Sequence, residues 1–528
     1  MAKRSVGVFF LLFCCFLVVI LRLFQISTSE EYSEVASQQS NRNFVADTSR
    51  GMIYDCHLTP LVNQRKEEKT VLLPGLSSVS YAKQAGLSES MIKSLQSGVP
   101  VVLDSAASPG DFARRITLTD RYQSAQPASH LIGYLDGDRK GASGLEKAYD
   151  ALLSAAGADL TVSYHIDAKG RILSGADTTV RHSAYETEDG LVTTIDSRIQ
   201  LVTDEVLRNS GKPGAVVVLD AKTGELRAAS SAPFFNPDAI AAALNGKDSP
   251  LLNRVCNAYS VGSVFKLCVA AAALEQGISP DYTYTCKDHI EVNGKVFHCA
   301  EEKSHGTVNL QTAIGESCNC YFINLAQQVG AKNVLNMAGR LGFGTSTMLC
   351  EGISSDPGNL PSEKTLQNPI AFANFSFGQG ELMATPIQIA QMVQAITNGG
   401  EYTPVSCVKG TIEDGKITAE QGGEAHTPRR AFSQETAETL MHCMIYTAET
   451  GLGRTGLPEA GGAGVKTATA QTGSFIEGKN ILQTWFSGFF PAYSPKYVVV
   501  VTLENGRSGG GSCGPLFKQI ADRINDFS

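Results

Sequence analysis

The sequence lacks the features that several large classes of protein need. It has no G-x-x-x-x-G-K-S/T loop, so nucleotide binding is not supported. It has no H-E-x-x-H pair of the kind that zinc proteases use. It has no basic cluster, and 44 Lys and Arg against 52 Asp and Glu give a net charge of −8, so nucleic acid is not an expected partner. No second long apolar run follows residue 26, which excludes a multi-pass membrane protein.

One long apolar run lies near the start of the sequence. It extends from Val6 to Ile26 and is interrupted mainly by Arg22 and Gln25. A membrane-spanning helix needs roughly 20 apolar residues, so this run is just sufficient. Lys3 and Arg4 precede it, and the positive-inside rule keeps that end in the cytoplasm. Because no small-residue cleavage site follows closely, we expect an uncleaved signal-anchor; a cleaved signal peptide is the alternative.

The character of the sequence changes near residue 190. Residues 27–190 are polar at first and then mixed, with no catalytic constellation, whereas strand-like and helix-like runs alternate from residue 191. This alternation predicts an α+β fold with helices on both sides of an antiparallel sheet. The expected organisation is a cytoplasmic tail at 1–5, a transmembrane signal-anchor at 6–26, an extracytoplasmic region at 27–190 and a catalytic domain at 191–528.

A serine followed three residues later by a lysine occurs four times, and only one case lies in an apolar, helix-forming run. The four pairs are Ser80 and Lys83, Ser90 and Lys93, Ser263 and Lys266, and Ser406 and Lys409. Only Ser263 lies in an apolar, helix-forming run, which we expect to be a buried helix from Ala258 to Gln276. On a helix, Ser263 and Lys266 lie one turn apart on one face, so the amine could take the hydroxyl proton and make the serine a nucleophile. The alternative is that Lys266 extends to the surface.

The single S-x-N sequence is Ser317 to Asn319, in an expected loop between two short helical patterns. There Ser317 could relay a proton, and the Asn319 amide could hold a substrate amide or the lysine. An ordinary turn is the alternative, because Ser and Asn are common in turns. We expect Cys318 and Cys320 to pack as small hydrophobic residues.

Two segments compete as a third element. Lys222-Thr223-Gly224 precedes Ser263 and lies between two strand-like runs, so it is expected to be a hairpin turn. Lys466-Thr467-Ala468 leads into further strand-like runs near the C-terminus. There Lys466 and the Thr467 hydroxyl would bind a carboxylate. The backbone N–H groups of Thr469 and Ser263 could form an oxyanion hole.

Two of the 13 cysteines flank a turn signal. Cys286 and Cys299 lie on either side of Asn293-Gly294, a pair typical of tight hairpins. A disulfide between them is one alternative and free thiols are the other. The nearby histidines are His289, His298 and His305. Because the spacing fits no standard zinc pattern, we expect no metal and no cofactor.

Taken in this order, the three elements resemble the motif set of the penicillin-binding proteins and serine β-lactamases. Further segments are similar to those of class B penicillin-binding proteins. They are Arg50–Asp55, Gly144–Tyr149, Thr194–Gln200, Gly378–Gly380 and Thr385–Gln388. The resemblance extends from about residue 40 to the end of the sequence.

This resemblance implies a fold and four catalytic roles. The fold would be a penicillin-binding or serine β-lactamase-like transpeptidase domain preceded by an extended pedestal domain. Ser263 would be the acylated nucleophile and Lys266 its base. Ser317 would be the proton shuttle, and Asn319 would position the substrate amide.

The resemblance also assigns substrate binding, with one departure from the family pattern. Lys466 and Thr467 would recognise the terminal D-alanine carboxylate, and the Thr469 N–H would complete the oxyanion hole. Ala468 stands where the family has glycine. A methyl group that points into the cleft could alter the range of substrates or the affinity for β-lactams, whereas one that points away should change little.

The function implied is that of a peptidoglycan D,D-transpeptidase on the outer face of the cytoplasmic membrane. Its expected partners are stem peptides ending in D-Ala-D-Ala, β-lactams and a membrane glycan polymerase. A β-lactam hydrolase or sensor is one alternative, although a sensor usually couples to a zinc protease and a hydrolase needs no pedestal. A non-catalytic scaffold for a glycan polymerase is another, although the intact catalytic set argues against it.

Overall fold

The computed structural model describes residues 2–106, 110–167, 172–173, 178–181, 185–419, 427–476 and 478–527. The chain divides into two compact units that alternate along the sequence. The first contains Met1–Arg50, Arg65–Arg121 and Ala155–Thr187, and the second contains Gly51–Gln64, Tyr122–Ser154 and Glu188–Ser528. Segments 51–64 and 122–154 therefore belong with the expected catalytic region rather than with the rest of 27–190. The reason is packing, because their buried apolar side chains join the larger core.

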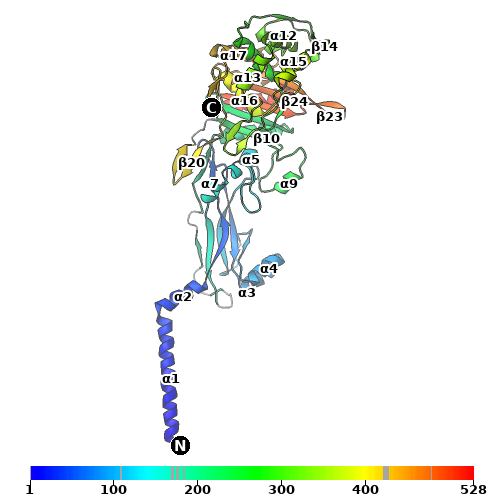
Figure 1. Ribbon diagram of the computed structural model, residues 1–528. Coiled ribbons are helices and arrows are strands. Elements are labelled where there is room, and N and C mark those ends of the chain that lie inside the picture. The colour runs from blue at the N-terminus through cyan, green and yellow to red at the C-terminus, as the bar shows by residue number, and fades with distance from the viewer. Residues whose placement is uncertain are drawn as a thin grey trace. The chain divides into compact units, whose positions relative to one another are not determined.

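The N-terminal apolar run forms one helix, α1 (Ala2–Thr28), drawn in blue in Figure 1. Its Lys3–Thr28 portion contains an 18-residue window with a mean hydropathy of 2.9 and is long and apolar enough to cross a membrane. Arg22 and Gln25, which interrupt its apolar run, are paired, since the Arg22 guanidinium donates to Gln25 Oε1 at 2.8 Å. Pairing of this kind reduces the cost of placing polar groups in an apolar helix.

The rest of the first unit contains two small antiparallel sheets, ordered β1-β6-β7 and β4-β3-β5. Buried residues of β3, β5 and β6 form one core, and helices α3 and α4 pack with β4 in a second. The bounds are α2 Glu30–Ser40, β1 Asn41–Thr48, β3 Arg65–Leu72, α3 Leu76–Gln84, α4 Glu89–Gln96, β4 Val101–Leu103, β5 Ala113–Asp120, β6 Asp159–His165 and β7 Thr179–Arg181.

The second unit is built on a five-stranded antiparallel sheet ordered β10-β9-β25-β24-β23. The strands are β9 Gly214–Asp220, β10 Leu226–Ala232, β23 Gly464–Ile476, β24 Lys479–Phe490 and β25 Tyr497–Glu504. The chain forms β9 and β10, leaves the sheet after residue 232 and returns to it only at residue 464. The segment between these two residues supplies the helices that cover one face of the sheet. The predicted α+β class, an antiparallel sheet flanked by helices, is confirmed.

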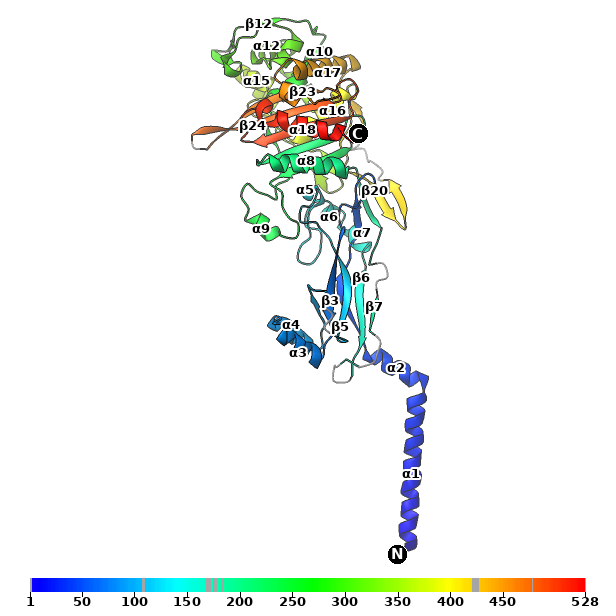
Figure 2. The same cartoon turned by 180° about the vertical axis from the view of Figure 1, so that it is seen from behind.

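The central strands are apolar on both sides because both faces of the sheet are covered. Val499 and Val501 of β25 face a core that contains residues of helices α8 (Ser197–Asn209) and α18 (Gly514–Asn525). Val498 and Val500 face the larger core on the opposite side. Figure 2 shows α8 and α18 lying across the same face of this sheet. Side chains alternate along a strand, so a strand buried on both sides has a continuous apolar sequence.

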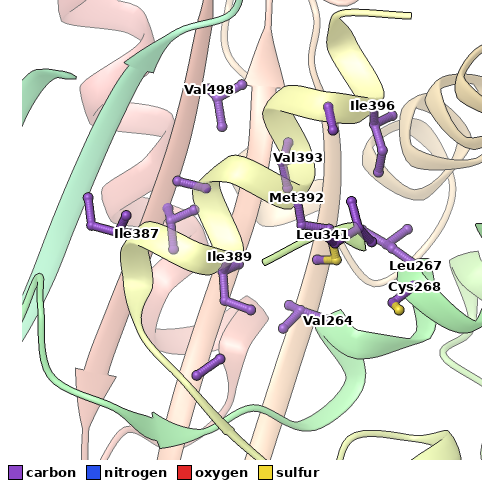
Figure 3. Close-up of a cluster of buried hydrophobic side chains, with 14 of the residues drawn as sticks. Val264, Leu267, Cys268, Leu341, Ile387, Ile389, Met392, Val393, Ile396 and Val498 are labelled. Atoms are coloured by element: carbon purple, nitrogen blue, oxygen red, sulfur yellow. The ribbon is translucent and has the colours of Figure 1, made fainter. Parts of the chain in front are cut away.

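Helix α16 (Pro386–Thr397) separates the sheet from the helix that follows Ser263. It begins with a capping box between Thr385 and Gln388 and has Pro386 in its first turn, which are strong start signals. In Figure 3 its side chains Ile389, Met392, Val393 and Ile396 lie between Val498 of β25 and the group Val264, Leu267 and Cys268. The nucleophile segment is thus held against the core by apolar contacts on one side.

The expected helix from Ala258 to Gln276 begins later than predicted. Tyr259 and Ser260 form β11 (Tyr259–Ser260), which pairs with β18 (Met383–Ala384). A 3₁₀ turn, η1 (Gly262–Phe265), follows and continues into α10 (Lys266–Glu275). The residues before Gly262 are extended because they satisfy their backbone groups across β18 instead of within a helix.

The other elements of the second unit surround this frame and are mostly short, apart from the 16-residue helix α17. The helices are α5 Ser129–Ile132, α6 Gly144–Ala148, α7 Asp150–Ala155, α9 Ile240–Leu244, η2 Ala300–Glu302, α11 Leu310–Gly315, α12 Asn319–Val329, α13 Ala331–Arg340, α14 Glu363–Leu366, α15 Pro369–Ser376, α17 Gln434–Glu449, η4 Arg454–Gly456 and η5 Gly509–Cys513. The strands are β2 Met52–Tyr54, β8 Gly190–Thr193, β12 Tyr284–Cys286, β13 His289–Val292, β14 Lys295–His298, β15 Gly306–Val308, β16 Met348–Cys350, β17 Ile353–Ser354, β19 Glu401–Tyr402, β20 Val408–Glu413, β21 Lys416–Ala419 and β22 Arg429–Arg430.

Two turn predictions are confirmed. Asn293 and Gly294 connect β13 to β14 with positive φ angles of 48° and 79°, as a tight hairpin requires. Lys222-Thr223-Gly224 forms the turn between β9 and β10, where the Asp220 carboxylate accepts hydrogen bonds from the N–H groups of Lys222 and Thr223.

Candidate active site

Ser263 and Lys266 lie one turn apart at the start of the buried helix α10. Gly262 precedes them with a φ of 67°, which turns the chain from β11 into the helix. Ser263 is half-buried, and among the described residues its hydroxyl has no hydrogen-bond partner. Lys266 is 0% exposed and does not reach the surface. The result is a hydroxyl without a partner among the described residues, on the same helical turn as a buried amine.

Three oxygen atoms surround the Lys266 amine. Nζ donates to the Ser317 carbonyl at 2.6 Å, to Ser317 Oγ at 3.2 Å and to Asn319 Oδ1 at 2.7 Å. The nitrogen also lies 5.6 Å from the centre of the Phe322 ring. Burial lowers the pKa of Lys266 to about 8 because the charged form loses hydration. About one tenth of the amine is therefore free base at pH 7 and about half at pH 8, so a proton acceptor is available.

Ser317 lies in the short, constrained loop between α11 and α12, as expected, and Asn319 is the first residue of α12. Ser317 has a φ of 54°, a left-handed conformation that costs a non-glycine residue roughly 1 kcal/mol or more. Cys318 caps α12, with its Sγ accepting from the N–H of Tyr321 at 3.4 Å. Asn319 Nδ2 donates to the His298 carbonyl at 2.9 Å, so its Oδ1 is directed toward Lys266. An ordinary turn would not need this set of contacts.

Lys466 approaches the same serine from the sheet. It lies on β23, which pairs only with β24 and is thus an edge strand in the described part of the chain. Its Nζ donates to Ser317 Oγ at 2.9 Å and to the Thr467 carbonyl at 2.8 Å. Burial first, and the charge of Lys266 second, hold the pKa of Lys466 well below its usual range. Two buried lysines therefore converge on one hydroxyl oxygen.

The next residues of β23 differ in their exposure. Thr469 is exposed, and its Oγ1 accepts from the Gly509 N–H at 3.2 Å, while Thr467 is largely buried. Ala468 is 3% exposed and faces the turn that carries Ser263, since a methyl group placed on Gly262 would lie 3.4 Å from the Ala468 Cβ. The extra methyl of this chain therefore packs against Gly262.

Two residues that position the Ser263 turn were not identified as such from the sequence. The Gly262 N–H donates to the Gly378 carbonyl at 2.7 Å, and a Cβ on Gly378 would lie 2.0 Å from the Gly262 carbonyl oxygen. Gly378 is thus required by a close approach of two backbones. Trp485 Nε1 donates to the Ser260 carbonyl at 2.9 Å. Gly378 could have been found through the G-Q-G segment, and Trp485 through being the only tryptophan.

The penicillin binding protein transpeptidase domain is the family whose profile matches this chain, over residues 214–522. Since that match covers more than half of the 528 residues, the chain belongs to this family. Its relatives are class B penicillin-binding proteins, and it is itself one of that class, as the resemblance predicted.

Two curated relatives illustrate the similarity. Stage V sporulation protein D of Bacillus subtilis is 30% identical over 414 residues, which cover 74% of this chain and 61% of that protein. Peptidoglycan D,D-transpeptidase MrdA of Acinetobacter baumannii is 28% identical over 458 residues, 77% of this chain and 66% of that protein. The chain thus spans between 61% and 66% of the length of these relatives.

Solved structures share the fold over nearly the whole chain. Penicillin binding protein 3 of Mycobacterium tuberculosis, complexed with ampicillin, matches with a TM-score of 0.66 and 25% identity over 90% of this chain and 95% of that one. A chain of a peptidoglycan synthase complex that coordinates polymerization and crosslinking matches with a TM-score of 0.71 and 24% identity, over 99% of this chain and 98% of that one.

Proposed function

We propose that the protein is a serine D,D-transpeptidase that cross-links peptidoglycan stem peptides and is acylated by β-lactams. The observation that carries the proposal is the convergence of Lys266 and Lys466 on Ser317 Oγ, beside a serine whose hydroxyl has no partner among the described residues. The names of relatives support the same reaction, since MrdA of Acinetobacter baumannii is a peptidoglycan D,D-transpeptidase. The ampicillin complex of the Mycobacterium tuberculosis protein supports the β-lactam reaction.

In the proposed first step, Ser263 Oγ attacks the carbonyl carbon of the penultimate D-alanine of one stem peptide. Lys266 in its free-base form takes the hydroxyl proton. The backbone N–H groups of Ser263 and Thr469 stabilise the oxyanion that develops on the carbonyl oxygen. The C–N bond to the terminal D-alanine then breaks, and the proton passes to the leaving amine through Ser317.

In the second step an amine of a neighbouring stem peptide attacks the acyl-enzyme, its proton is transferred back through the same groups, and Ser263 is released. Asn319 positions the substrate amide, and Lys466 with the Thr467 hydroxyl binds the terminal carboxylate. The hydrogen bond from Lys466 to Ser317 supports this assignment, because it links the carboxylate-binding group to the proton path. A β-lactam follows the first step, but its leaving group stays attached, so the acyl-enzyme persists.

The organisation that we propose is a single-pass protein with a cytoplasmic tail at 1–5, an anchor at 6–26, an extracytoplasmic pedestal at 27–190 and a transpeptidase domain at 191–528, with segments 51–64 and 122–154 of the pedestal region packing into the unit of the transpeptidase domain. The apolar helix α1 and the family match over 214–522 support it. The catalytic domain would lie outside the cytoplasmic membrane, where peptidoglycan is assembled. A membrane glycan polymerase is the proposed partner, because the structurally similar peptidoglycan synthase complex coordinates polymerization with crosslinking.

The test is acylation of the full-length chain in detergent by a fluorescent penicillin, followed by gel fluorescence and intact-mass spectrometry. The variant Ser263→Ala removes the nucleophile, and Ser90→Ala is the matched control because Ser90 is an exposed serine in another S-x-x-K sequence. We expect one penicillin per chain in the wild type and in Ser90→Ala, and none in Ser263→Ala. An adduct that survives in Ser263→Ala, or a folded wild type without any adduct, would refute the proposal. Rapid loss of the adduct would instead indicate a hydrolase.

A further inference from the structure

Three cysteines and one histidine bring their donor atoms together next to the loop that carries Ser317. Cys286 ends β12, Cys299 follows β14, His305 precedes β15 and Cys318 caps α12. Their donor atoms, the Sγ atoms and a ring nitrogen, all lie within 4.8 Å of one another. The three cysteines are buried and the histidine is half-buried. Residues from four separate segments therefore direct soft ligand atoms at one point.

The distances match the edges of a tetrahedral metal site. With Zn–S bonds of about 2.3 Å and Zn–N bonds of about 2.0–2.1 Å, a tetrahedral ion holds neighbouring sulfurs about 3.8 Å apart, and a sulfur and a nitrogen about 3.5 Å apart. Here Cys299 Sγ lies 3.7 Å from both Cys286 Sγ and Cys318 Sγ. Cys286 Sγ lies 3.5 Å from His305 Nδ1. A disulfide would need about 2.0 Å between sulfurs, so these are free thiols at ligand spacing.

We propose that Cys286, Cys299, His305 and Cys318 bind one structural zinc ion. Three thiolates and one imidazole form a closed tetrahedral set of the type found in structural zinc sites. Binding of Zn²⁺ releases three protons from the thiols, and the resulting site carries a net charge of −1. The spacing along the chain did not predict this site, because the fourth ligand, Cys318, lies outside the strand segment and caps helix α12.

A fourth thiol nearby tests the assignment. Cys320 Sγ lies 3.5 Å from Cys299 Sγ, yet it is outside the group whose donor atoms are all mutually within 4.8 Å. Small buried cysteines can also pack simply as hydrophobic residues, which is the alternative for all of these thiols. In that case no particular set of them would matter for metal binding.

The ion would connect a weakly supported segment to the candidate active site. Residues 284–308 contain two isolated two-stranded pairs, β12 with β15 and β13 with β14, and such pairs are marginally stable alone. This segment supplies three of the four ligands. It also supplies the His298 carbonyl that accepts from Asn319, while Cys318 lies between Ser317 and Asn319. The zinc would thus position the loop that holds Lys266, a role that rests on the proposed function.

The metal itself can be measured without any activity. The full-length chain would be purified in detergent under reducing conditions, and its metals would be counted by mass spectrometry. We expect about one zinc per chain, and we expect Co²⁺ bound in its place to give thiolate charge-transfer and tetrahedral d–d absorption. Cys299→Ser and His305→Ala should lower bound zinc to below about one fifth of that amount, and Cys320→Ser should retain it.

Three outcomes would overturn the proposal. One is a wild type that holds no zinc and takes up neither Zn²⁺ nor Co²⁺ after reduction. A second is an intact mass showing a disulfide among the four residues in protein purified without reductant. The third is loss of zinc in Cys320→Ser equal to that in Cys299→Ser. Because the first measurement uses the wild type, misfolding of a variant does not prevent a decision.

The positioning role has its own test. Chelation of the wild-type zinc should slow acylation by a penicillin at least about tenfold and lower the Tm, and added Zn²⁺ should restore both. Ser263→Ala should retain the zinc but form no adduct, so the metal site and the acylation mechanism can fail independently. An acylation rate that is unchanged after complete removal of zinc would refute the positioning role.

Discussion

Replacement of Ala468 by glycine, the residue usual in the family, tests where its methyl group points. The structure places this methyl against Gly262, not in solvent, with 3% of the residue exposed. Loss of a buried methyl costs about 0.8 kcal/mol, and glycine within a strand costs a further 0.5–1 kcal/mol, roughly. We therefore expect Ala468→Gly to lower the free energy of unfolding by about 1.5 kcal/mol and to change acylation less than about twofold.

Enlarging the side chain at position 468 should, in contrast, slow acylation strongly. Ala468→Val adds two methyl groups next to Gly262 and the Ser263 turn, in a place where overpacking costs about 1–3 kcal/mol. Displacement of that turn should slow acylation more than about tenfold, equivalent to about 1.4 kcal/mol in the barrier.

The assay is the second-order rate of adduct formation with a fluorescent penicillin, measured beside thermal unfolding of each full-length variant. The reasoning would be refuted if Ala468→Gly changed acylation more than about tenfold with an unchanged Tm, because the methyl would then have to reach the substrate. Equal acylation by Ala468→Val and wild type would also contradict the packing against Gly262.

Three other predictions concern backbone contact, proton transfer and pH. Gly378→Ala should slow acylation at least about tenfold because its Cβ would lie 2.0 Å from a carbonyl oxygen. Gly380 also has a positive φ, but a Cβ there would make only an ordinary contact at 3.5 Å, so Gly380→Ala should be much less affected in the same adduct assay. Acylation of the wild type should rise with pH to a plateau above about 8, where Lys266 becomes free base, and Lys266→Arg, which stays charged, should form no adduct. A rate independent of pH between 6.5 and 9, roughly, would contradict that role for Lys266. Burial raises the pKa of Asp204 from 3.8 to about 6, so the folded protein holds this proton more tightly than the unfolded chain does. The free energy of unfolding should therefore fall by up to about 3 kcal/mol as the pH rises from 3.8 to about 6. Asp204→Asn should remove this pH-dependent contribution to stability. The test is urea unfolding of the wild type and of Asp204→Asn at both ends of the pH window, and an equal pH dependence of stability in the two proteins would contradict the argument.

Much of the site could be predicted from the sequence because its components are local. Ser263 and Lys266 share a face because a helical turn fixes residues three apart. The Asn293-Gly294 turn followed from the φ angles that these residues tolerate. The motif order also predicted the family, which the match over 214–522 confirms.

The start of the nucleophile helix was predicted less well. Tyr259 and Ser260 have a sequence compatible with helix, but pairing with Met383 and Ala384 makes them extended. Those two partners lie more than 120 residues further along the chain, so propensity could not reveal them. The same reason explains why the role of Gly378 was missed.

By itself, the sequence determined the chemistry that is available: a serine and lysine on one helical turn, a second lysine on a strand, and cysteines without a standard spacing. Only the tertiary structure decided how these groups meet. It directs Lys466 to Ser317 across 149 residues, places the Ala468 methyl against Gly262, and gathers Cys286, Cys299 and Cys318 at 3.7 Å spacings. The physical reason is that backbone periodicity fixes the directions of neighbouring side chains, whereas contacts between distant segments depend on how apolar faces pack into one core.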